Sequence, residues 1–124
     1  MDNKALNYLS LARKGGLAEL GEEPVGAIAR TGKAYVILVA SDASDHTWRR
    51  AKSFAAGTEQ QCVRMEATKD EMGLAIGRTS LAIAAITDVA MALALVKALP
   101  KADPQTLEVL TAKAAKAKKR QAEA

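Results

Sequence analysis

Two apolar runs of strand length do most to constrain what this chain can fold into. Residues 34–40 read AYVILVA and residues 81–86 read LAIAAI, and neither run contains a charged side chain. A strand with one face in water alternates apolar and polar residues, so continuous runs of this length are typical of strands covered on both faces. The chain therefore needs helices on both sides of a sheet.

Helix patterns surround these two runs. Apolar spacing and capping residues, such as Thr68 with Glu71 in a capping box and Thr87-Asp88 before an apolar segment, mark the ends of the helices. The sequence predicts helices over 3–13, 22–30, 44–56, 68–77 and 87–99, a short extended piece over 17–20 and a weaker strand over 61–66. The predicted fold class is α/β: a three-layer α/β/α sandwich with a small mixed, mostly buried sheet, plus a C-terminal tail helix that starts at Asp103-Pro104.

The length of 124 residues supports one main domain, because two cores of about 60 residues each would be marginal without metals or disulfides. We assign residues 1–100 to this domain and residues 101–124 to a basic helical tail. The chain has 27 alanines and only four aromatic residues. We therefore expect a thin core of small side chains, with Tyr8, Trp48 and Phe54 contributing to it.

The net charge of +4 is unevenly distributed, since residues 101–124 carry six basic and three acidic groups. The basic groups near the C-terminus allow two interpretations. They form either a solvated helix end or an electrostatic contact with phosphates of a nucleic acid. The residues concerned are Lys113, Lys116, Lys118, Lys119 and Arg120.

The sequence offers no convincing catalytic, metal or cofactor site. Asp42, Asp45 and His46 form the only acid–histidine cluster, and a metal site needs three or four converging ligands. We interpret them as acids at a helix N-terminus beside a solvated histidine. Cys62 is the only cysteine and is expected to be a small buried hydrophobe. We predict a protein that is not an enzyme and binds no cofactor or metal.

The ends of the chain and its most apolar window bear on localisation. The N-terminus lacks a basic segment followed by an apolar one, so no signal peptide is expected. Residues 81–99 are long enough to span a membrane, but Asp88 lies near their middle, where a charge is costly in a bilayer. We expect a cytoplasmic, bacterial-type protein without a membrane segment.

Three stretches in order resemble one family of proteins. They are LARKGGLAELGEE (11–23), GKAYVILVASDAS (32–44) and TKDEMGLAIGRTSLAIAAITD (68–88). Together they resemble the ribosomal protein L-seven-Ae superfamily, and most closely its bacterial YlxQ-like branch. The resemblance covers roughly residues 3–99. Its most specific parts are the strand that ends in Ala-Ser-Asp-Ala-Ser and the Thr-Lys-x-x-x-Gly-x-x-x-Gly pattern.

The resemblance implies binding of structured RNA, in the ribosome or elsewhere. In that superfamily, the loop entering the second helix and the loop before the last strand grip a kink-turn, a sharply bent internal loop. Carried over to this chain, the first element is Gly21 through Ala27 and the second is Gly77 through Leu81. The RNA-binding residues implied by the resemblance are Gly21, Glu22, Glu23, Ala27, Arg30, Lys33, Arg78, Thr79 and Ser80.

Some of these positions depart from the pattern of the kink-turn binders. Those proteins carry an Asn-Glu or Lys-Gln pair and a Lys one turn later, where this chain has Glu23, Pro24 and Ala27. A carboxylate repels phosphates and proline has no N–H to donate, so the replacements argue against kink-turn recognition in the family's manner. The alternative function is a protein-interaction or self-association module on the same fold that has lost kink-turn binding.

Overall fold

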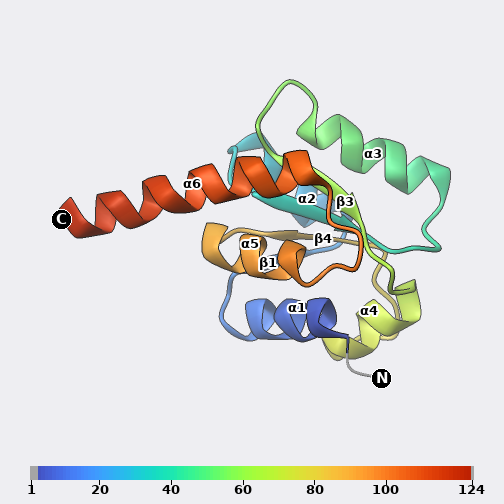
Figure 1. Cartoon of the computed structure of the whole chain (residues 1–124). Coiled ribbons are helices and arrows are strands. Elements are labelled where there is room, and N and C mark those ends of the chain that lie inside the picture. The colour runs from blue at the N-terminus through green and yellow to red at the C-terminus, as the bar shows by residue number, and fades with distance from the viewer. Residues whose placement is uncertain (1–2, 124) are drawn as a thin grey trace.

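A computed structural model describes residues 3–123, which form six helices and one sheet of four strands (Figure 1). In chain order the elements are α1 (Lys4–Lys14), β1 (Ala18–Leu20), α2 (Glu22–Arg30), β2 (Val36–Val39), α3 (Asp45–Ala55), β3 (Gln61–Arg64), α4 (Lys69–Ala75), β4 (Ile83–Ile86), α5 (Val89–Lys97) and α6 (Pro104–Glu123). The sequence predicted each of these elements, with the segment of β1 given as a short extended piece. Local caps explain this: the side chains of Thr68 and Glu71, for example, form the predicted capping box of α4.

The sheet is mixed, as predicted, and its strand order is β1-β4-β2-β3. Strand β2 pairs with β3 in parallel, whereas β4 runs antiparallel to both β1 and β2. Strands β2 and β4 are therefore central and fully buried, as their continuous apolar sequences indicated. Strands β1 and β3 form the two edges of the sheet.

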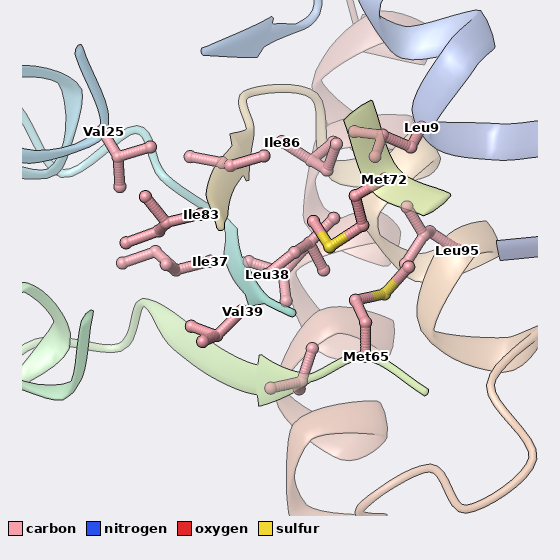
Figure 2. Packing of buried hydrophobic residues seen from close by; sticks show 14 of the residues in the cluster. Leu9, Val25, Ile37, Leu38, Val39, Met65, Met72, Ile83, Ile86 and Leu95 are labelled. Atoms are coloured by element: carbon pink, nitrogen blue, oxygen red, sulfur yellow. The ribbon is translucent and has the colours of Figure 1, made fainter. Parts of the chain in front are cut away.

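Helices cover both faces of the sheet, which confirms the α/β/α sandwich. Helices α2 and α3 pack on one face, and α1, α4 and α5 lie on the other (Figure 1). Side chains alternate between these layers along each strand. Figure 2 shows Ile37 and Val39 of β2 on the side of the sheet where Val25 of α2 lies, while Leu38 is on the opposite side with Leu9 of α1 and Leu95 of α5.

Small side chains let the helices approach the sheet closely. Ala84 and Ala85 in β4 are completely buried, as are Ala12 in α1 and Ala92 in α5. These positions account for part of the alanine-rich composition. Larger aromatic residues lie at the margin instead: Tyr8, Trp48 and Phe54 are partly buried against the core, so their predicted place in the core is right only in part.

The first part of α6 packs on the domain. Leu110 has no exposed surface and belongs to the core, and the Thr106 hydroxyl donates a hydrogen bond of 3.0 Å to Oε1 of Gln61 in β3. Helix α6 runs beside α5, and its C-terminal part extends away from the sandwich (Figure 1). None of the helices within residues 3–123 is long and apolar enough to cross a membrane.

Candidate nucleic-acid interface

The two segments implied in RNA binding lie at the same end of the sheet. Gly21 directly follows β1, and residues 77–82 directly precede β4. Because β1 and β4 are antiparallel, the end of one lies beside the start of the other, and the Gly21 N–H donates a 2.9 Å hydrogen bond to the Ile83 carbonyl. Residues 21–27 and 77–81 together are called the Gly21/Arg78 surface below.

Gly73 holds the second segment of this surface in place. Its carbonyl accepts a 2.8 Å hydrogen bond from the Arg78 N–H, and a Cβ built on Gly73 would lie only 2.6 Å from the Ser80 nitrogen. The loop can therefore pack on α4 only because this position has no side chain. The sequence pattern of residues 68–77 included Gly73, but its role depends on a contact that the pattern does not reveal. The loop then exposes Arg78, Thr79 and Ser80 to solvent.

The start of α2 forms the first segment of the Gly21/Arg78 surface. Gly21 is the N-cap residue, and its φ of 97° lies in the region that favours glycine. No side chain caps this helix end, so the first N–H groups of α2 are not used by a capping side chain. Proline at position 24 removes one of these donors, which leaves the N–H groups of Glu22 and Glu23. These two N–H groups at the start of α2 can therefore still donate hydrogen bonds to an anion.

An arginine from α3 offsets part of the negative charge of this surface. Arg50 Nε lies 2.7 Å from Glu22 Oε1, and its guanidinium group lies 5.0 Å from the centre of the Phe54 ring. The ion pair is half exposed and adds little stability, about 0–1 kcal/mol. The pairing also matters for a ligand, because a paired Glu22 repels phosphates less than a free carboxylate does. Arg50 is 28 residues away from Glu22, and sequence reasoning missed it.

A groove of about 680 Å³ lies between α2 and α3 beside this ion pair. Its lining includes Glu23, Ala27 and Arg30 from α2 and Arg50 and Phe54 from α3. Arg30 therefore lies beside the Gly21/Arg78 surface, since it extends the same groove towards the other end of α2. The groove carries two arginines next to two glutamates and is mixed in charge rather than simply acidic.

Lys33 lies away from this surface. It follows α2 and precedes β2, at the end of the sheet opposite to Gly21. Its N–H donates to the Ile28 carbonyl, and the next residue is held by Gln60, whose Oε1 accepts a 2.8 Å hydrogen bond from the Ala34 N–H. The structure therefore separates Lys33 from the other residues implied by the resemblance.

The basic tail is also directed to the opposite end. Lys118 and Gln121 of α6 line a groove with Asp88, which follows β4, whereas Arg78 and Leu81 lie before β4. Lys113 is engaged with the domain through an ion pair of 3.2 Å with Glu59. Lys116, Lys118, Lys119 and Arg120 are exposed, so they can contact a polyanion, but only at a place remote from the Gly21/Arg78 surface.

The other candidates from the sequence have structural roles or no partners for chemistry. Asp42 accepts a 2.8 Å hydrogen bond from the Lys69 N–H and so fixes the start of α4, while Asp45 and His46 are exposed. No group of three or more His, Cys, Asp or Glu side chains in residues 3–123 is placed to hold a metal ion. Cys62 is half-buried, and burial raises the pKa of its thiol to about 11.

Comparison with solved structures shows that other proteins have the fold of this chain. No protein-family model matches the chain, and no curated protein matches it significantly in sequence. Many solved structures share its fold, and two of them illustrate the likeness. A Bacillus halodurans protein of unknown function is 21% identical, with a TM-score of 0.74 over 81% of this chain and 100% of that one. A Giardia lamblia 15.5-kDa RNA-binding protein is 16% identical, with a TM-score of 0.60 over 85% of this chain and 92% of that one.

Proposed function

We propose that this chain is a non-enzymatic, cytoplasmic RNA-binding protein of the L-seven-Ae type, which binds structured RNA through the Gly21/Arg78 surface. The observation that carries the proposal is the meeting of residues 21–27 and 77–81 at one end of the sheet, joined by the hydrogen bond from Gly21 to Ile83. Ribosomal RNA is one class of ligand that fits this proposal. The described RNA-binding protein from Giardia, which shares the fold, supports it.

The chemistry of this surface suits RNA better than a small-molecule reaction. Arg78, Thr79 and Ser80 offer a positive charge and two hydroxyl groups on a loop anchored by Gly73. RNA internal loops are recognised through their shape, their phosphates and their splayed bases, for which such donors are suited. We infer that Pro24 and Ala27, which lack the expected donors, change the RNA preference away from the usual kink-turn.

Equilibrium binding at several salt concentrations tests the proposal. A kink-turn RNA and a scrambled stem of the same length would be titrated with the wild-type chain, with Arg78→Gln and with Arg13→Gln, a control on the exposed end of α1. We expect salt-sensitive binding that differs between the two RNAs. Loss of one phosphate contact in Arg78→Gln should lower the salt slope by about 1. Absence of binding to both RNAs at low salt would refute the proposal.

A second candidate function, protein interaction or self-association, is favoured by one surface feature. Helices α5 and α6 enclose a mostly apolar groove of about 620 Å³, whose lining includes Ala90, Leu93 and Ala94 from α5 and Ala114 and Ala117 from α6. Small side chains of this kind permit close packing of another helix. Measurement of the molecular mass in solution tests self-association. A monomer at high protein concentration would count against a second copy in this groove.

A further inference from the structure

A compact group of cations surrounds the only tryptophan of the chain, on the side of α3 that faces β3. The Arg64 guanidinium lies 4.7 Å from the centre of the Trp48 ring, and Lys52 Nζ lies 5.6 Å from it. Arg49 is adjacent on the exposed surface of α3. These four residues, Trp48, Arg49, Lys52 and Arg64, are called the Trp48 cluster.

The fold explains why these groups come together. Arg64 pairs in register with Val39, whose side chain points towards α2 and α3, so Arg64 also points to that layer. Its Nη1 donates a 3.1 Å hydrogen bond to the Ser41 carbonyl, which fixes the guanidinium group at the end of β3. Lys52 follows Trp48 by one helical turn and reaches the same ring.

The positive charges of the cluster are available to a ligand. Within residues 3–123, the ion pairs are Arg50 with Glu22 and Lys113 with Glu59, so none of the three cations of the cluster is paired. Arg49, Lys52 and Arg64 are all exposed. The acids nearest in sequence, Asp45 and Glu66, are exposed as well and make no ion pair with them. The cluster therefore carries a local excess of positive charge.

The cluster is connected to the Gly21/Arg78 surface through α3. Arg50, on the opposite flank of the same helix, is bound to Glu22 at the start of α2. Successive residues of a helix are about 100° apart, so Arg49 lies between Arg50 and Trp48 on the outer side of α3. A chain of cations thus leads from the proposed RNA surface across α3 to the edge strand β3.

We propose that the Trp48 cluster is a second RNA contact, which binds a single-stranded segment next to the structured element. This inference rests on the proposed RNA-binding function. Lys52, Arg64 and Arg49 neutralise backbone phosphates, and an unpaired base stacks on the planar guanidinium of Arg64, which lies over the partly buried Trp48 ring. Such a combination of cations with an aromatic ring is how proteins bind single strands without strong sequence preference.

The fluorescence of Trp48 gives a direct test, because no other tryptophan contributes to the signal. A uridine octamer and an adenosine octamer would be titrated into the full chain at low and at moderate salt. We expect quenching of Trp48 by both, with a salt slope that Lys52→Gln plus Arg64→Gln lowers by about 1.4 for two lost single-strand contacts. Affinity should fall at least tenfold in this double variant.

Matched controls separate the possible outcomes. Arg13→Gln plus Lys14→Gln removes the same charge from the exposed end of α1 and should leave octamer binding unchanged. Lys52→Gln alone keeps the hydrogen bond from Arg64 to Ser41, so an intermediate loss in this variant would show that the effect is not misfolding. Equal affinities of the two double variants, or no quenching of Trp48, would overturn the proposal.

Titrations with the structured RNA and with polyglutamate, beside the octamers, distinguish this inference from the proposed function. If the structured RNA binds through Arg78 while the octamers leave Trp48 unquenched, the Trp48 cluster is not an RNA contact and the proposed function stands. If the octamers quench Trp48 but Arg78→Gln has no effect on the structured RNA, the cluster binds RNA and the Gly21/Arg78 surface does not. Binding of polyglutamate as tight as that of RNA would indicate an acidic protein partner and overturn the proposal.

Discussion

Replacement of Gly73 by alanine should both destabilise the protein and disturb the proposed RNA surface. A Cβ at this position would lie 2.6 Å from Ser80 N, 2.7 Å from Ser80 Cα and 2.8 Å from the Thr79 carbonyl carbon. All three are backbone atoms, so rotation of a side chain cannot relieve the overlap. The loop that carries Arg78 must move, and with it the hydrogen bond from the Arg78 N–H to the Gly73 carbonyl.

The size of the effect follows from two opposing contributions. Overpacking in a tight site costs about 1–3 kcal/mol, and three backbone overlaps place this case at the upper end. Alanine inside a helix is favoured over glycine by about 0.8–1 kcal/mol, which offsets part of the loss. We therefore expect Gly73→Ala to lower the free energy of unfolding by about 2 kcal/mol.

Urea denaturation followed by circular dichroism measures this difference. Gly15→Ala is the matched control, because Gly15 has a φ of −84° and its nearest neighbour would be the Leu11 carbonyl oxygen at 3.4 Å. It should leave stability unchanged or raise it by up to about 1 kcal/mol. A Gly73→Ala protein as stable as the wild type, with unchanged RNA affinity, would refute the close contact between α4 and the 78–80 loop.

Three other changes test separate parts of the account. Leu110→Ala should lower the free energy of unfolding by about 2–5 kcal/mol, because Leu110 is completely buried; a loss below about 1 kcal/mol in thermal or urea denaturation would show that α6 does not dock. Gln60→Leu leaves the Ala34 N–H and the Ala29 carbonyl without their hydrogen bonds of 2.8 and 3.1 Å, and should cost about 1–3 kcal/mol for each group left unpaired. Burial raises the pKa of the Cys62 thiol from 9.0 to about 11, so the unfolded chain loses this proton first as the pH rises. Stability should therefore fall between pH 9 and pH 11 more steeply in the wild type than in Cys62→Ala; equal slopes would contradict the shift.

The sequence predicted the elements well because their signals are local. Asp88 caps α5 through a hydrogen bond from the Met91 N–H, and the capping box of Thr68 starts α4, both within three residues. The order β1-β4-β2-β3 depends on contacts between distant segments, for which no local signal exists. The continuous apolar runs of β2 and β4 did indicate that these two strands are buried on both faces.

The candidate site was predicted only in outline for the same reason. The resemblance placed residues 21–27 and 77–81 in one site, and the structure brings them together. It could not show that Arg50 reaches Glu22 from another helix, or that Arg64 stacks near Trp48 from β3. Both contacts join residues more than 15 positions apart. They form because α3 packs on the sheet beside α2 and β3. The direction of α6, which separates the basic tail from the loops, is likewise a tertiary feature.

The most direct test of RNA binding by this face is to map where RNA crosslinks to the protein. Ultraviolet crosslinking in cells, followed by identification of both the RNA and the modified peptides, gives the ligand and its position together. We expect crosslinks in peptides that contain residues 21–30 and 77–81, on a structured RNA. Crosslinks confined to the tail, residues 113–120, or recovery of no specific RNA, would contradict this expectation.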